Sequence, residues 1–262
     1  MKFDHVISEG LNYRLSGISN MLLNLIFHKI VLRESDLDDK YTVTYIYFEN
    51  IINEITKILN RGLCKFQDFR IYFDDGNDSF EKLILPKLTT LLKKRTTLAV
   101  VTNWIGKKGY LNSYLFKKYL KEDIKIASHG VSHSALAVYR NGILQNSLKR
   151  GRYQYSPFEQ GDVLSEREIL YQLIESKKKL LKVAINTDEF VLPHGLYNDT
   201  VMKLNFEFGV YKYLSTCDEY LDGGEPLRPR FLVDNEKTIS KTIKQISNLS
   251  DIYDFKSLQN HG

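Results

Sequence analysis

Short apolar runs recur along the chain, and most are separated by segments with the 3.6-residue spacing of an amphipathic helix. The runs predict strands at residues 22–27, 70–73, 98–102, 124–127, 189–192, 210–214 and 230–233. The segments between them predict helices at 45–60, 79–92, 111–120, 165–181 and 200–206, and a last helix at 237–246, after good N-cap residues at 234 and 235. Alternating strand and helix favours an α/β fold with a parallel sheet, and about seven such units predict a closed or nearly closed barrel.

The 262 residues are enough for one domain of barrel size, so we expect a single domain over residues 1–262. One long segment, at about residues 140–162, breaks the alternation and is rich in Arg, Tyr and Gly. We interpret it as an inserted loop over the active end of the barrel.

Composition and charge then exclude several classes of protein. Charged residues make up 26% and apolar residues 43% of the chain, which is ordinary for a folded globular protein. The net charge of +5 is spread over several basic clusters with acidic residues between them, and no recognition motif accompanies it, so we expect no nucleic-acid partner. Cys64 and Cys217 are too few and too far apart for a disulfide framework or a CxxC site.

The beginning of the sequence bears on location. Its first twenty residues mix acidic and basic side chains and contain no apolar signal region, and the apolar stretch at 21–27 is too short to span a bilayer. We therefore expect a cytoplasmic protein without a membrane span.

Two polar clusters follow predicted strands directly. Asp74 and Asp75 come after the second strand, and His129 and His133 come after the fourth. Because parallel barrels carry their reactive groups at the carboxyl ends of the strands, these clusters can converge at one end of the sheet. His28 and His194 fall at the same end.

Two interpretations of each cluster are open at this point. Asp-Asp-Gly suits a tight turn, and two histidines can simply be polar residues of a loop that contains Ser and Gly. However, His129 and His133 are four residues apart, so both imidazoles lie on one face if the segment turns helically, as in HExxH zinc sites. Two imidazole nitrogens and one carboxylate, with positions left for water and substrate, indicate a hydrolytic metal site.

Three segments carry a family resemblance. FDDG at 73–76, SHGVSH at 128–133 and LPHGLYN at 192–198 resemble, in order and spacing, the successive motifs of the polysaccharide deacetylase, or NodB-homology, family. The resemblance implies a distorted (β/α) barrel and the metal-dependent hydrolysis of the N-acetyl group of an amino-sugar glycan or glycan precursor. Carried over, it assigns Asp74 as general base and Asp75, His129 and His133 as metal ligands.

The resemblance also raises the question of the general acid. Most family members supply a histidine from a Leu-x-His motif near the carboxyl terminus, which this chain lacks. A circularly permuted branch, which resembles biofilm-glycan deacetylases, carries the equivalent histidine on its first strand. LNLIFHKI at 23–30 looks like that element, so we predict His28 as the general acid; the alternative is a histidine that only caps a buried strand end.

The third motif departs from the family pattern in two places. An arginine that orients the base often begins it, but Val191 stands there, and Arg230 is a possible substitute. His194 occupies a position that is usually aromatic, where it could form a pocket wall or a fourth ligand. We also expect the backbone N–H near Leu196 or Tyr197 to support the oxyanion, and Trp104 to be either a sugar platform or a packing residue.

The cofactor and the function follow from these assignments. Zinc fits the ligand types, and cobalt, nickel or manganese also bind imidazole and carboxylate. The leading hypothesis is a metal-dependent carbohydrate N-deacetylase with a carbohydrate substrate. Its alternatives are a glycan-binding module of the same fold that has lost turnover, and a basic nucleic-acid-binding protein.

Overall fold

The structure is a computed structural model that describes residues 22–137, 139–140, 143–144, 148–149, 164–219 and 226–259. At its centre is an eight-stranded sheet in the order β13-β12-β10-β6-β5-β4-β1-β14, in which all neighbouring strands are parallel. The strands are β1 (Leu22–Phe27), β4 (Asp68–Phe73), β5 (Thr96–Val100), β6 (Lys125–Ser128), β10 (Glu189–Val191), β12 (Tyr213–Ser215), β13 (Leu227–Arg228) and β14 (Phe231–Leu232). Each predicted strand lies within a few residues of an observed one.

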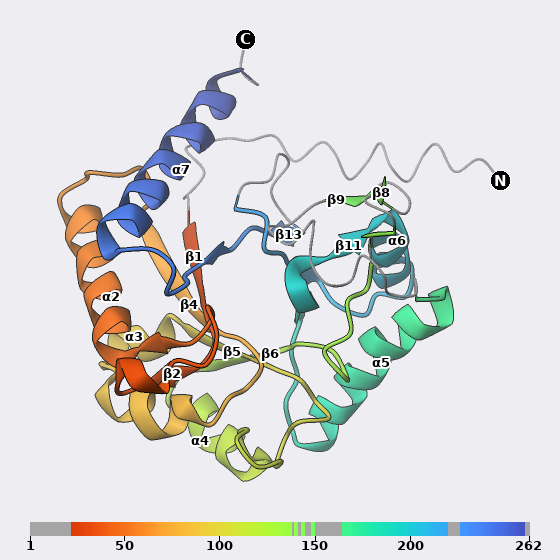
Figure 1. Ribbon diagram of the computed structural model, residues 1–262. Helices are drawn as coiled ribbons and strands as arrows, with labels where there is room; N and C mark the ends of the chain where they lie inside the picture. Colours follow the sequence, from red (N-terminus) through yellow and green to blue (C-terminus); the bar gives the residue numbers. More distant parts are fainter. Residues whose placement is uncertain are drawn as a thin grey trace.

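The two edges of the sheet are joined by very little chain. β13 lies at one edge and β14 at the other, yet only Pro229 and Arg230 separate them in sequence. The sheet must therefore curl until its edges approach each other, with β13 and β14 together acting as one interrupted strand (Figure 1). This arrangement confirms the predicted distorted (β/α) barrel of about seven parallel strands.

Helices cover the outside of the curled sheet (Figure 1). They are α2 (Tyr45–Asn60), α3 (Thr90–Lys94), α4 (Phe116–Lys121), α5 (Glu166–Lys182), α6 (Asp199–Glu207) and α7 (Ile239–Gln259). Helix α2 shows why they form: the Thr44 hydroxyl accepts from the backbone N–H of Tyr47, and an apolar stripe that includes Ile51 and Ile55 is buried. Three further pairs of short strands are β2 (Ile30–Val31) with β3 (Val43–Thr44), β7 (Tyr139–Arg140) with β8 (Ile143–Leu144), and β9 (Leu148–Lys149) with β11 (Tyr197–Asn198).

Two helix predictions need correction. The segment at 79–92 is not one helix but a π-helical turn at Phe80–Ile84, a 3₁₀ turn at Leu85–Lys87, and α3. Pro86 contributes to the break because proline lacks an N–H, and the helical backbone ends at Leu88, which is extended with ψ of 128°. The last helix runs from Ile239 to Gln259 rather than over 237–246, and the Thr238 hydroxyl, not residues 234 or 235, accepts from the backbone N–H of Lys241.

Strand alternation determines which side chains enter the barrel. On β4, Ile71 and Phe73 pack in the main core cluster, which also includes residues of α2, whereas Tyr72 packs with small residues of neighbouring strands. Because alternate residues of a strand share a face, Asp74 continues the inward side of Tyr72. The barrel interior therefore receives an acid at the carboxyl end of β4.

The predicted loop at about 140–162 lies mostly outside the described residues, so one domain with an insertion stays a prediction. Within the described part of the chain, every helix is too short or too polar to cross a membrane.

Candidate metal and catalytic site

The two aspartates after β4 point in different directions because the backbone turns sharply between them. Asp74 donates its backbone N–H to the Phe27 carbonyl, which continues the strand pairing by one residue. Asp75 then adopts a left-handed conformation with φ of 71°, and Gly76 follows with φ of 74°. Asp74 thus stays in the barrel interior, while Asp75 lies at its rim with 26% of its side chain exposed.

The two histidines come together through a loop rather than the expected helical turn. After β6, Gly130 has φ of 80° and His133 has φ of 59°. The Gln172 side chain of α5 holds this loop by accepting hydrogen bonds from the backbone N–H groups of Val131, at 2.8 Å, and Ser132, at 3.2 Å. The centroids of the His129 and His133 imidazole rings lie 4.8 Å apart.

Asp75, His129 and His133 present one ligand atom each, and these atoms lie within 4.8 Å of one another. The Oδ1 atom of Asp75 is 3.5 Å from His129 Nε2 and 3.2 Å from His133 Nε2. This oxygen is buried and has no hydrogen-bond partner among the residues that the structure describes. On the other side of the His129 ring, Nδ1 bonds to the Val191 carbonyl at 2.8 Å, which leaves Nε2 free to act as a ligand.

These observations fit a divalent cation. An orphaned carboxylate oxygen that faces two imidazole nitrogens is costly without a cation and suitable with one. Backbone strain supports the same interpretation: Asp75, His133 and His194 are three of the five described non-glycine residues with positive φ. The set of two nitrogens and one oxygen leaves coordination positions for water and substrate.

Electrostatics separate the two histidines. Burial opposes the charged form of His129, but Asp75 and Asp74 outweigh it and raise the pKa of this imidazole. Burial, followed by the charge of His129, lowers the pKa of His133 to about 3. The carboxylates that favour positive charge here would equally attract a metal cation.

Asp74 is held by Arg230. One guanidinium nitrogen, Nη1, donates to both carboxylate oxygens at 2.8 and 3.0 Å, and Nε donates to the Thr216 carbonyl at 3.0 Å. Both side chains are almost completely buried. Burial alone would raise the pKa of Asp74, but the charges of Arg230, His129 and His28 outweigh it and hold the pKa below its ordinary value. The third motif lacks an arginine at Val191, and Arg230, which lies between β13 and β14, contacts Asp74 in its place.

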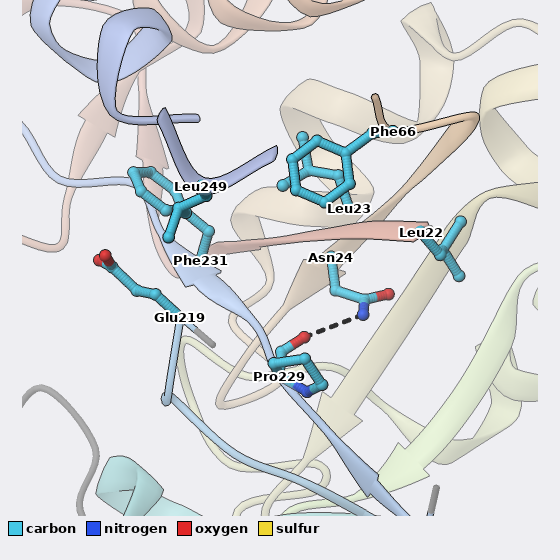
Figure 2. Close-up of a pocket in the computed structure, with 8 residues that line it drawn as sticks. All are labelled: Leu22, Leu23, Asn24, Phe66, Glu219, Pro229, Phe231 and Leu249. Carbon is cyan, nitrogen blue, oxygen red and sulfur yellow. Dashed lines mark hydrogen bonds between the residues drawn. The ribbon is translucent and has the colours of Figure 1, made fainter. Parts of the chain in front are cut away.

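The backbone beside Arg230 is anchored as well. Figure 2 shows Asn24 of β1 with its side-chain amide directed at Pro229, and Nδ2 donates to the Pro229 carbonyl at 2.9 Å. The surrounding side chains, which include Phe66, Phe231 and Leu249, are apolar except for that of Glu219. This contact ties the segment between β13 and β14 to β1, the neighbour of the edge strand β14, and fixes the start of the arginine side chain.

His28 follows β1 on the other side of Asp74. Its ring lies 5.2 Å from that of Tyr41, and its Nδ1 atom is buried without a hydrogen-bond partner among the described residues. His28 and Asp75 both line a cavity of about 290 Å³. The other lining residues are Lys29, Asp38, Asp39, Tyr41, Thr42, Asn77 and Tyr110. The predicted general acid therefore shares an open space with a predicted metal ligand.

The remaining predicted residues surround this centre. The ring of His194 packs at a tilt against that of His133, with ring centroids 4.3 Å apart, and its Nε2 is 3.3 Å from the His133 carbonyl oxygen. Trp104 lies 5.3 Å from the ring of His133 and 4.9 Å from that of Tyr110. His194 is outside the group of converging ligand atoms, so its position favours a wall over a fourth ligand.

Tyr197 is fully buried, and its hydroxyl donates to Asp218 at 3.1 Å. The Leu196 N–H donates to the Pro193 carbonyl, and Tyr197 is paired with Lys149 between strands β11 and β9. Oxyanion support from either backbone amide stays a prediction.

Several residues of this region were not predicted. Tyr41 and Tyr110 line the cavity, and Tyr72 and Glu189 lie inside the barrel below Arg230. The one available signal was Glu189, an acidic residue at the start of an apolar strand. The tyrosines are too common in this chain, at 17, to have been singled out.

Comparison with known proteins gives the same family from sequence and the same fold from structure. The sequence model of the polysaccharide deacetylase family matches residues 67–213, which is more than half of the chain. Among curated proteins, no sequence matches significantly.

Solved structures of deacetylases resemble the chain at low sequence identity. IcaB from Ammonifex degensii superposes with a TM-score of 0.61 at 15% identity, over 88% of this chain and 97% of that one. The Streptococcus pyogenes deacetylase PplD, in complex with acetate, gives 0.59 at 18% identity, over 86% and 97%. A de-N-acetylase from Aggregatibacter actinomycetemcomitans gives 0.59 at 17% identity, over 86% and 99%.

The residues that the family model matches include all three predicted motifs, at 73–76, 128–133 and 192–198. The chain belongs to the polysaccharide deacetylase family.

Proposed function

We propose that this protein is a metal-dependent N-deacetylase that hydrolyses the N-acetyl group of an amino-sugar glycan or glycan precursor, releasing acetate and a free amine. The observation that carries the proposal is the convergence of Asp75, His129 and His133 beside an Asp74 that Arg230 holds in place. Family membership supports glycan deacetylation as the reaction class.

The three converging side chains would hold one divalent ion, for which zinc suits the ligand types best. When bound, such an ion polarises an amide carbonyl and lowers the pKa of a water molecule. Burial of His129 and its Nδ1 bond to Val191 keep Nε2 directed at the ligand position.

Asp74 is the proposed general base. Its pKa lies below the ordinary value, so it is ionised at neutral pH and can accept the proton of the attacking water. Arg230 fixes the rotation of the carboxylate through Nη1 and stabilises its charge. Since Arg230 occupies one side of both oxygens, the proton is accepted on the side that faces the histidines.

His28 is the proposed general acid for the departing amine. It lines the same cavity as Asp75, its ring contacts that of Tyr41, and Nδ1 has no hydrogen-bond partner in the described part of the chain. The tetrahedral oxyanion that precedes amine departure would be stabilised by a backbone N–H near Leu196 or Tyr197. His194 and Trp104 would form walls on the His133 side of the pocket.

One neighbour provides independent support for the product. The Streptococcus pyogenes deacetylase that shares the fold was solved with acetate, the acid that our reaction would release. A carbohydrate substrate fits the cavity, since Tyr41 and Tyr110 can stack on sugar rings while Asp38, Asp39 and Asn77 offer polar groups to hydroxyls.

The experiment that tests the proposal combines metal analysis with an acetate-release screen over N-acetylhexosamine oligomers and nucleotide sugars. We expect about one divalent ion per chain, acetate release from at least one substrate, and loss of this activity with chelator and in Asp74→Asn. Glycan binding without acetate release, under zinc, cobalt, nickel and manganese in turn, would instead select the non-catalytic binding module.

A further inference from the structure

Beneath the proposed base, the barrel interior contains a second layer of polar contacts that the reaction scheme does not use. The Tyr72 hydroxyl donates to Glu189 Oε1 at 2.7 Å. The hydroxyl of Ser215 donates to the same oxygen, and Arg228 Nη1 donates to Oε2 at 3.0 Å. Tyr72 is fully buried and Glu189 is 7% exposed, so this network lies away from solvent.

The network reaches Arg230 through the face of an aromatic ring. The guanidinium carbon of Arg230 lies 5.0 Å from the centroid of the Tyr72 ring, within the range of a cation–π contact. Charges therefore alternate along the interior, from Asp74 through Arg230 and the Tyr72 ring to Glu189 and Arg228. A phenol that donates to a carboxylate gains electron density, which strengthens the attraction of its ring for a cation.

We propose that Tyr72 and Glu189 are positioning residues for the deacetylation, which set the place of Arg230 and through it the orientation of Asp74. Three further contacts hold the Arg230 guanidinium: Nη1 donates to Asp74, Nε donates to the Thr216 carbonyl, and Nη2 lies 3.9 Å from Cys217 Sγ. The Tyr72 ring adds a contact with the face of an aromatic ring. Without its bond to Glu189 the ring can shift, and the guanidinium can shift with it.

The inference rests on the proposed function, and its test uses Tyr72→Phe with a matched control. Tyr119 is also a buried residue, and its hydroxyl donates to Glu81 at the same distance of 2.7 Å, but this bond is only partly buried and lies on the outside of the barrel. Both Tyr→Phe changes remove one phenol-to-carboxylate bond. We expect Tyr72→Phe to lower kcat by about tenfold with KM and metal content unchanged, and Tyr119→Phe to leave kcat within twofold.

Glu189→Gln provides a second variant that keeps the shape and the accepting oxygen but removes the charge. We expect it to lower kcat less than Tyr72→Phe does, again without a change in KM. An unchanged kcat in both site variants, or an equal loss in Tyr119→Phe, would overturn the inference even though the wild-type protein releases acetate.

A measurement independent of substrate keeps the two proposals distinguishable. In urea unfolding, Tyr72→Phe and Asp74→Asn each change the unfolding equilibrium constant. We expect the change in the double variant to differ by about threefold or more from the product of the two single changes, because both substitutions act on Arg230. Tyr119→Phe and Asp74→Asn should combine independently. Independent effects in both pairs would overturn the positioning role, whereas a wild-type protein that never releases acetate would overturn only the proposed function.

Discussion

Asp74 and Asp75 are adjacent in sequence and identical in chemistry, yet the fold gives them opposite surroundings. Both oxygens of Asp74 accept from Arg230 in the closed interior of the barrel, whereas Oδ1 of Asp75 faces two imidazole nitrogens and accepts no hydrogen bond from the described part of the chain. The left-handed backbone of Asp75 makes this difference possible. The comparison teaches that a satisfied carboxylate suits proton transfer and an unsatisfied one suits a metal.

The largest effect should follow from changing the unsatisfied acid. Asp75→Asn removes the charge that balances a cation, so we expect metal affinity to fall more than about 100-fold and acetate release to be lost. Metal content after dialysis, measured by mass spectrometry, checks the first part. Asp78→Asn is the control, because its carboxylate only pairs with Lys82 at the surface; retention of metal by Asp75→Asn would show that the two acids have been assigned wrongly.

Asp74→Asn should separate catalysis from metal binding. We expect kcat to fall by about 10²–10⁴-fold, because an amide cannot accept the water proton, while the metal content stays near that of the wild type. Steady-state acetate release and metal analysis on the same sample provide the check. Loss of metal in this variant would mean that Asp74 is itself a ligand.

His28→Ala tests whether His28 is the general acid of the reaction in which Asp74 is the base. We expect a fall in kcat of about 100-fold with metal content intact, since the departing amine then lacks a positioned proton donor. A matched change on the metal side is His194→Asn, in which asparagine tolerates the φ of 58°. His194→Asn should retain metal. Unchanged turnover in His28→Ala would contradict the assignment of His28 as general acid.

Arg230→Met should reveal the cost of leaving Asp74 buried and unpaired. We expect the free energy of unfolding to fall by about 3–5 kcal/mol, and Asp74→Asn in the same chain to restore much of it. Urea unfolding followed by circular dichroism measures both. Arg95→Met breaks the more exposed pair with Asp68 and should cost less than about 1 kcal/mol; equal losses in the two arginine variants would contradict the special environment of Asp74.

The strands and the four central residues could be predicted from the sequence because both depend on local signals. Buried parallel strands are continuous apolar runs, and polar clusters directly after them mark the carboxyl ends. Helix α2 matched its predicted range of 45–60 for the same reason, since its apolar stripe and its Thr44 cap lie within the segment.

Features that depend on contacts between distant segments could not be predicted in the same way. Tyr72 and Glu189 are 117 residues apart, and no local pattern indicates that they meet. The loop that joins His129 to His133 takes its shape from Gln172 of α5 rather than from a helix of its own, so the HExxH-like geometry was wrong although the pairing was right. The place of Arg230 was inferred only through resemblance, because the closure that carries it to Asp74 is a property of the whole sheet.

The most direct test of the account is anomalous X-ray diffraction at the zinc edge from crystals of the zinc-loaded protein. The account predicts one peak at about 2.0–2.2 Å from a carboxylate oxygen of Asp75 and from Nε2 of both His129 and His133, with Asp74 still bonded to Arg230. A peak coordinated by Asp74 or by His194 in place of one of these ligands, or zinc bound only elsewhere on the chain, would contradict it.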